Sequence, residues 1–144
     1  MVGRRRFFQG LGAAAGAAAL APSLVSQAQD LEIHRLPRSV AGHEIEGAFT
    51  YLGAVVLRMR DDSGQQYQID ILARGGAQGV RDTSHYSLFL ANRGNGNKAT
   101  DETHGASLIA IADWLESEQP NLPAVMTFEE RSAAHPNGNF LLPS

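Results

Sequence analysis

The stretch from Ser84 to Glu118 constrains the fold most, because it joins a strand pattern, a turn and a helix with both a start and a stop signal. Pro120 ends this helix through the restriction that it places on the preceding residue. A helix with one apolar stripe needs an apolar surface to cover, and we interpret the other segments as strands that supply it. The stripe follows the helical spacing i, i+3, i+4 and i+7: Leu108, Ile111, Ala112 and Leu115.

The start of the helix has two alternatives. Thr100 or Asp101 would cap it, with Asp101 and Glu102 near the positive end of the helix dipole. Gly105 weakens the first turn, so the helix would otherwise begin only near Ala106.

The residues before the helix alternate as those of a strand do. Tyr86, Leu88 and Leu90 share one face, and the opposite face carries Phe89 beside polar residues. We therefore expect a central strand that is covered on both sides. Gly and Asn dominate the segment 93–97, which is expected to be a turn.

Alternation also predicts strands on either side of this stretch. The sequence Asp-Asp-Ser-Gly at 61–64 is a turn signal and predicts a β-hairpin. We expect a loop at 74–83 and a turn at 136–139. The order of elements predicts an α+β fold, with an antiparallel sheet of about five strands and one helix packed across one face. The expected strands are 43–51, 53–60, 65–72, 84–92, 124–128 and 140–142.

The N-terminal segment 1–28 has the three parts of an export signal. Basic and aromatic residues precede an apolar run rich in Ala and Gly, and 26–28 is a small-x-small cleavage site. The run is too short and too rich in alanine for a membrane anchor, since a span needs about 20 strongly apolar residues. We expect a signal peptide at 1–28, an extended lead-in at 29–41 and a single α+β domain at 42–144. The start of the signal resembles a twin-arginine motif: Arg4, Arg5, Arg6, Phe7 and Phe8.

Export by this route predicts a periplasmic or secreted protein, with the twin-arginine translocase as a partner during export. Cargo that resembles this class is usually exported folded, often with a cofactor already inserted or with a second protein that rides along. The sequence has no obvious cofactor motif, so it fits the second case at least as well.

The charge balance argues against nucleic acid or an anionic membrane surface as a partner. Three of the 12 basic residues lie in the leader, so 9 basic and 15 acidic residues remain and the formal charge is −6. The chain has no cysteine, which excludes a disulfide, a thiolate metal site and a lipoprotein anchor.

A metal site would need histidines that the fold brings together. The five histidines include no pair at i and i+4 and no His-Glu-x-x-His motif. Neutral imidazoles with a thioether suit copper, and the candidate ligands are His85, His104 and Met59. The alternative is that the histidines are simply exposed on strands and turns.

No pattern in the sequence points to catalysis, so we expect a protein without enzymatic activity. The glycine-rich run 75–79 lacks the Lys-Ser/Thr of a phosphate loop. Ser84 and His85 are neighbours on the expected strand and would face opposite ways, so they would not form a nucleophile–base pair. Asp61 and Asp62 are interpreted as a hairpin tip.

From His85 and Tyr86 onward the chain resembles the tyrosinase cofactor proteins, also called tyrosinase copper chaperones. The similarity spans about 67–118, beside the twin-arginine-like leader. The shared features are a short chain, a strand pair, a Ser-His-Tyr strand end and one helix rich in Ala and Leu. The resemblance implies a protein that carries the export signal for a copper enzyme that has none. It also implies that the protein shields the enzyme's site, presents a tyrosine to it and passes copper through His and Met side chains.

Only His85 and Tyr86 carry over from that family. Its His-x-Met on the preceding strand is absent, because Gln-Ile-Asp-Ile stands at 68–71. The segment between Tyr86 and the helix is also longer here and lacks the family's proline. The departures put the copper-delivery role in question.

Three hypotheses follow for function. The first is an exported accessory protein that binds a secreted partner through His85 and Tyr86; an exported redox enzyme such as a copper oxidase would be that partner. The second is a non-catalytic small subunit of an exported oxidoreductase. The third is a stand-alone periplasmic module that binds a small ligand in a pocket between sheet and helix. The alternative for Tyr86 is a place in the core, on the same face as Leu88 and Leu90.

Overall fold

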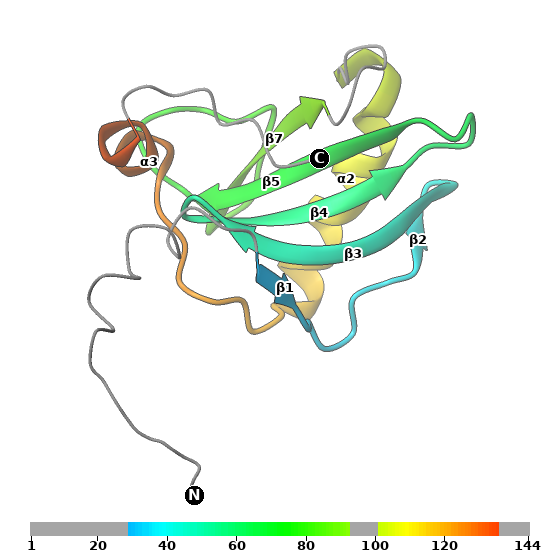
Figure 1. Cartoon of the computed structure of the whole chain (residues 1–144), viewed down its shortest axis with the longest axis horizontal. Coiled ribbons are helices and arrows are strands. Elements are labelled where there is room, and N and C mark those ends of the chain that lie inside the picture. Colours follow the sequence, from blue (N-terminus) through cyan, green and yellow to red (C-terminus); the bar gives the residue numbers. More distant parts are fainter. Residues whose placement is uncertain (1–28, 93–100, 136–144) are drawn as a thin grey trace, which may run out of the picture.

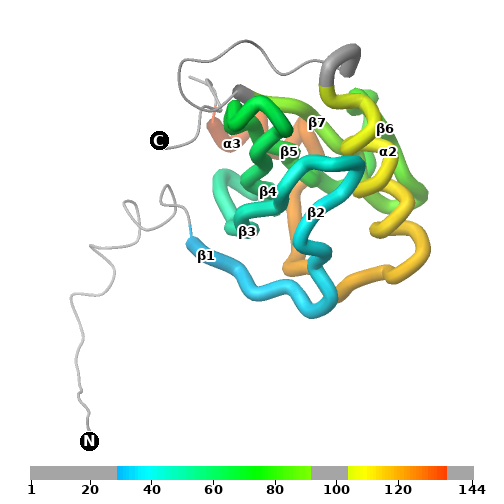
Figure 2. The backbone as a smooth tube through the Cα atoms, turned by 90° about the vertical axis from the view of Figure 1, so that its right-hand side faces the viewer, coloured from blue at the N-terminus to red at the C-terminus, as the bar shows by residue number. Residues whose placement is uncertain are grey.

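The computed structural model describes residues 29–92 and 101–135. Seven strands form one antiparallel sheet in the order β1-β3-β4-β5-β7-β6, and β2 pairs with β3 beside this path (Figure 1). Helices α2 and α3 lie on opposite faces of the sheet (Figure 2). The elements are β1 Gln29–Leu31, β2 Ser39–Val40, β3 His43–Tyr51, β4 Ala54–Arg60, β5 Gln66–Ala73, β6 Arg81–Asp82, β7 Tyr86–Asn92, α2 Asp101–Glu118 and α3 Phe128–Ala134.

The α+β class agrees with the sequence prediction, but the described residues form seven strands rather than about five, and two helices rather than one. Strands β1 and β2 lie in the expected lead-in at 29–41, and β6 lies in the expected loop at 74–83. Each of these strands pairs through only two or three residues. Strands this short leave no alternation for a sequence pattern to show.

Two tight turns join β2 to β3 and β3 to β4. Ala41 and Gly42 have φ angles of 51° and 81°, and Leu52 and Gly53 have 48° and 79°. Positive φ at both central residues is typical of the type I′ hairpin turn. Gly53 therefore belongs to the turn, not to the strand expected at 53–60.

Helix α2 covers the sheet face that carries Tyr67, Ile69 and Ile71 of β5. It begins at Asp101, so the helix does not start only near Ala106, and Gly105 lies within it. The apolar stripe is confirmed, because all four of its side chains are buried in the cluster between helix and sheet: Leu108, Ile111, Ala112 and Leu115.

The opposite face of β5 is polar and yet buried. Gln68 and Asp70 are 0% and 4% exposed. On this face Phe89 of β7 stacks on Phe128 of α3, with ring centroids 5.2 Å apart. Strand β7 is thus covered on both sides, as the sequence predicted.

The strand expected at 124–128 is wrong. Thr127 makes only one bridge, to Ala73, and α3 begins at Phe128. Oγ1 of Thr127 accepts a hydrogen bond of 3.1 Å from the backbone N–H of Glu130. Thr127 and Glu130 have the Thr-x-x-Glu spacing of a capping box, and the bond to Thr127 is one of the two hydrogen bonds of that motif. This spacing was the signal in the sequence for a helix start.

Several predicted segments lie outside the described residues. These are the signal peptide at 1–28, the turn at 93–97, the cap at Thr100, the turn at 136–139 and the strand at 140–142.

Candidate functional site

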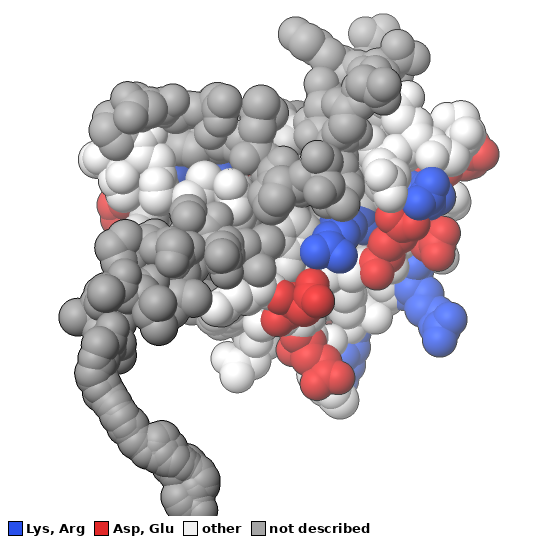
Figure 3. Space-filling view, viewed as in Figure 1, with Lys and Arg blue, Asp and Glu red and all other residues white. Residues whose placement is uncertain are grey.

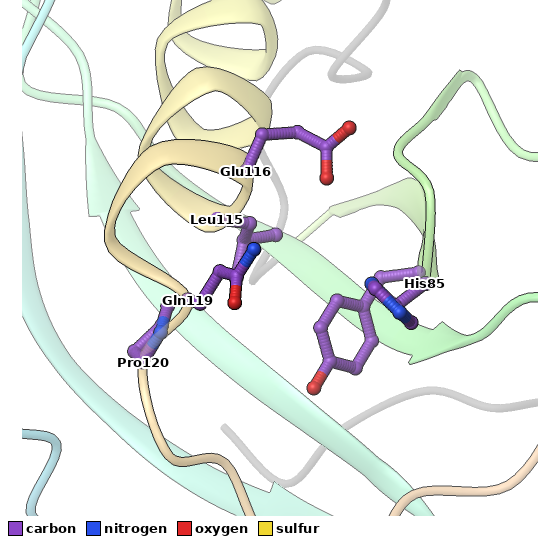
Figure 4. Close-up of a pocket in the computed structure, with 6 residues that line it drawn as sticks. His85, Leu115, Glu116, Gln119 and Pro120 are labelled. Carbon is purple, nitrogen blue, oxygen red and sulfur yellow. The ribbon is translucent and has the colours of Figure 1, made fainter.

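A surface pocket lies between the start of β7 and the C-terminal end of α2 (Figure 4). Its volume is about 230 Å³. Both residues that the sequence singled out for partner binding contribute to its wall. The lining side chains are His85, Tyr86, Leu115, Glu116, Gln119 and Pro120. We call this pocket the β7–α2 pocket.

A turn stabilised by Thr83 carries His85 and Tyr86 into this wall. Oγ1 of Thr83 accepts hydrogen bonds from the backbone N–H of His85 at 3.3 Å and of Tyr86 at 2.9 Å. Thr83 is itself buried, and a threonine hydroxyl that bonds to the backbone of the residues after it stabilises such a turn. Strand β7 therefore begins at Tyr86, one residue after the turn.

Ser84 links His85 to Glu116. Its hydroxyl lies 2.5 Å from Oε1 of Glu116 and 3.0 Å from Nδ1 of His85, and its backbone N–H donates to Oε2 of Glu116 at 3.2 Å. A 2.5 Å contact to a carboxylate requires the hydroxyl proton, so Ser84 donates to Glu116 and His85 donates from Nδ1 to Ser84.

The expectation that Ser84 and His85 face opposite ways is therefore wrong, since both lie in a turn ahead of β7. The direction of the protons nevertheless excludes the role of His85 as a base toward Ser84, because His85 is the donor. The arrangement is a clamp between the turn and the helix rather than an activated nucleophile.

The end of α2 forms the opposite wall of the pocket. Gln119 has a positive φ of 45°, and its N–H donates to the carbonyl of Leu115 at 3.2 Å. This backbone shape is a helix C-cap, and Pro120 prevents continuation of the helix. No basic residue lies in the last turn of α2, so nothing on the helix offsets the negative end of its dipole.

Tyr86 has a mixed environment. It is half-buried and packs against the main apolar cluster, and it also lines the pocket. The place in the core is thus confirmed in part, and the contact with a partner stays a prediction.

A second polar group lies at the far end of α2, where the helix crosses β3 and β5. The hydroxyl of Tyr67 is 2.6 Å from Nδ1 of His43 and 2.7 Å from Oγ of Ser107. The ring of His104 lies 4.0 Å from that of Tyr67, centroid to centroid, and its Nε2 is 3.4 Å from Oδ2 of Asp61. We call these residues the Tyr67 cluster.

The hydrogen bonds of the Tyr67 cluster fix the positions of its protons. Oγ of Ser107 donates to the carbonyl of His104 at 2.8 Å, so the Tyr67 hydroxyl donates to Ser107. The Tyr67 oxygen must then accept from His43, which places a proton on Nδ1 of that imidazole. Tyr67 and Ser107 are fully buried, and His43 is half-buried.

Two acids of this cluster have shifted pKa values. Burial, reinforced by the charge of Asp61 and only partly offset by the bond to Ser107, raises the pKa of Tyr67 to about 12. Burial also disfavours ionised Asp61, but hydrogen bonds from Ser63, Gln65 and His104 outweigh it and lower the pKa of Asp61 to about 2.

Two of the predicted copper ligands, His85 and His104, are not brought together. His85 belongs to the turn that Ser84 links to Glu116. His104 lies twelve residues before Glu116 on α2, which is about 18 Å along the helix axis. Met59 is fully buried in the apolar cluster, and Nε2 of His104 is directed at Asp61. The described residues contain no group of three or more His, Cys, Asp or Glu placed to hold a metal ion. His85 and His104 therefore cannot bind the same copper ion in this structure.

Sequence reasoning missed the Tyr67 cluster. Its members come from β3, β5, the β4–β5 turn and α2, and no spacing along the chain relates them. Asp61 was interpreted only as a hairpin tip, which is correct, because its Oδ1 accepts from the N–H groups of Ser63 and Gln65. Its second role, toward His104, depends on the packing of α2.

Charges are mixed on the face shown in Figure 3, where basic side chains lie among acidic ones. Arg60 pairs with Glu46 at 2.6 Å and Arg58 with Asp30 at 3.3 Å. Within 29–92 and 101–135, neither helix is at once long enough and apolar enough to cross a lipid bilayer.

Comparison with known proteins gave no match, whether to family models, to curated sequences or to solved structures.

Proposed function

We propose that this chain is an exported accessory protein that binds a secreted partner enzyme through the β7–α2 pocket. The observation that carries the proposal is that His85 and Tyr86 line one surface pocket together with the end of α2. A half-buried tyrosine at the wall of a pocket is typical of the anchor positions that dominate protein–protein binding.

The size of the pocket favours a protein partner over a free small molecule. Small-molecule sites usually have about 300–1,000 Å³, and the 230 Å³ of this pocket lies below that range. A single side chain that projects from a partner surface suits such a volume. The rest of the interface would then lie around the pocket.

The leader supports the exported part of the proposal, and with it a periplasmic or secreted location. An exported redox enzyme is the partner class that a twin-arginine leader favours. Copper delivery is not part of the proposal, because His85 and His104 lie near different ends of α2 and the described residues contain no group of three or more His, Cys, Asp or Glu placed to hold a metal ion.

Partner binding can be tested by co-purification from the periplasmic and culture fractions. We expect an exported enzyme to be recovered with the wild type and lost with the double variant His85→Ala/Tyr86→Phe. Ile109→Ser is the matched control, since Ile109 is 43% exposed on α2 and does not line the pocket. Equal recovery of the same enzyme with the double variant would contradict the proposal.

The same experiment separates the other two hypotheses. A small subunit would remain in a stoichiometric complex with an oxidoreductase through all purification steps. A ligand-binding module would be recovered as a monomer with a small molecule bound, which native mass spectrometry would reveal.

Export can be tested independently. Replacing Arg5 and Arg6 by Lys should trap the chain in the cytoplasm, because twin-arginine signals depend on both arginines. Cell fractionation followed by immunoblotting measures this. Undiminished mature protein outside the cytoplasm would exclude the route.

A further inference from the structure

The β7–α2 pocket has a pronounced electrostatic asymmetry. Glu116 is its one carboxylate, and neither Lys nor Arg is among the side chains that line it. Figure 4 shows the Glu116 side chain reaching from α2 toward the turn that carries His85.

Glu116 has no cationic partner among the described residues. Both of its contacts are with Ser84, through the hydroxyl and the backbone N–H, and these are neutral donors. An ionised carboxylate offers about four acceptor positions, so each oxygen can accept one further bond. Glu118, two residues later on the helix, does have a cationic partner, because it pairs with Arg35 at 3.0 Å. Among the ion pairs of the described residues, none includes Glu116.

The backbone adds to this field. The pocket lies beside the last turn of α2, at the negative end of the helix dipole, and that turn has no basic side chain. The imidazole of His85 donates from Nδ1 to Ser84, so in its neutral form the other ring nitrogen is an acceptor.

The remaining walls suit a long side chain with a cationic head. Leu115 and Pro120 present apolar surface, and Tyr86 presents an aromatic ring. A guanidinium group stacks well on an aromatic ring and can donate to both carboxylate oxygens at once, whereas an ammonium acts as a point charge. Arg74, which follows β5, is not among the lining side chains, and its Nη1 donates to the carbonyl of Thr83 at 2.7 Å.

We propose that the β7–α2 pocket takes an arginine side chain from the partner protein, with its guanidinium on Glu116 and its methylene stem against Leu115 and Pro120. This inference rests on the proposed function. The formal charge of −6 that remains once the leader is excluded complements a basic partner surface and would speed association with it.

Titration of the ¹⁵N-labelled protein with two blocked tripeptides, Gly-Arg-Gly and Gly-citrulline-Gly, tests the proposal by NMR. Citrulline keeps the shape of arginine and lacks the charge. We expect the arginine peptide to shift the amide signals of Ser84, Glu116 and Gln119, and to bind at least about threefold more tightly than the citrulline peptide, as for a partly exposed charge pair. The binding should weaken as salt is added.

Glu116→Gln keeps an acceptor for Ser84 and removes the charge, and it should reduce arginine binding about three- to tenfold. Asp113→Asn is the matched control, because Asp113 is an exposed carboxylate on the same helix that does not line the pocket. It should leave binding within about twofold of the wild type.

Equal binding of the two peptides by the wild type would overturn the proposal, and this arm needs no variant to fold. Equal losses in Glu116→Gln and Asp113→Asn would overturn it as well, since they would indicate a general effect of net charge. If partner capture depends on His85 and Tyr86 but the arginine peptide does not bind, the arginine inference is wrong and the proposed function stands. If the arginine peptide binds at the pocket and no partner is captured, the cation preference is supported and the proposed function is wrong.

Discussion

The carboxylate of Asp70 and the guanidinium of Arg131 meet at 3.1 Å between β5 and α3, with side chains only 5% and 3% exposed. Burial raises the pKa of Asp70, and the charge and hydrogen bond of Arg131 offset only part of that effect. Asp70 therefore depends on α3 for its compensating charge.

We expect Arg131→Met to lower the free energy of unfolding by about 3–5 kcal/mol, because it leaves Asp70 buried without its cation. The loss should be smaller at about pH 4 than at pH 7, since a raised pKa lets Asp70 take up a proton in the folded state as the pH falls. Urea denaturation measures both.

The double variant Asp70→Leu/Arg131→Met should recover most of the loss. Arg81→Met, at an exposed arginine, is the control. A loss below about 1 kcal/mol for Arg131→Met would contradict this account.

Asp61 gives a second pH-dependent prediction. Its pKa of about 2 lies below the ordinary value of 3.8, so the unfolded chain binds its proton first as the pH falls. The stabilisation of the folded state by ionised Asp61 is therefore complete above about pH 4 and disappears as the pH falls through 2. Asp61→Asn should cost about 1–3 kcal/mol at pH 7, and the difference from wild type should shrink over that window. Asp62→Asn, at the exposed neighbour, should show neither effect.

The hydroxyl of Tyr67 can be tested at alkaline pH. The unfolded chain ionises this phenol near 10, whereas the folded protein resists ionisation up to about 12. The contribution of the protonated Tyr67 hydroxyl to the free energy of unfolding is thus complete below about pH 10 and falls as the pH rises from about 10 to 12. Tyr67→Phe should remove that dependence and cost about 1–3 kcal/mol at pH 7, because Ser107 and His43 lose a buried partner. Unchanged stability at pH 7 would mean that the hydrogen bonds make no net contribution.

The stripe of α2 offers a matched pair of isoleucines. Ile111 is fully buried against the sheet, and Ile109 is 43% exposed on the same helix. Ile111→Asp should cost several kcal/mol, because it places an unpaired charge in the core. Ile109→Asp should change stability by less than about 1 kcal/mol. Thermal melts of both variants measure the contrast, and similar melting temperatures would exclude the described packing.

Ala41 is not the most suitable residue for the backbone conformation of the turn between β2 and β3. Ala41 holds a φ of 51°, which costs an L-residue with a Cβ roughly 1–2 kcal/mol. Asn tolerates this region, and Asn-Gly is a preferred type I′ pair. Ala41→Asn should therefore stabilise the protein by about 0.5–1 kcal/mol. The same exchange at the exposed helical residue Ala106 should instead destabilise it by a few tenths of a kcal/mol.

Local periodicity determined a large part of this fold. The helix stripe at Leu108 and Ile111 and the alternation of Tyr67, Ile69 and Ile71 predict which side chains turn toward the core. They do so because a strand repeats every two residues and a helix every 3.6, which neighbouring residues alone set. The hairpin turn around Asp61 was predictable from its residues, because Asp-Asp-Ser-Gly at 61–64 is a turn signal.

Only the tertiary structure decided what covers each face and which polar groups meet. The sequence contains no sign that the face with Gln68 and Asp70 is covered, yet both side chains are buried, and Asp70 meets Arg131 of α3. Ser84 reaches Glu116 across 32 positions of the chain, and Tyr67 reaches Ser107 across 40. Such contacts depend on how elements pack after they form, and no periodicity along the chain records them. The sequence by itself therefore determined the elements and their inward faces, while the packing of α2 and α3 on the sheet decided the pocket, the buried ion pair and the Tyr67 cluster.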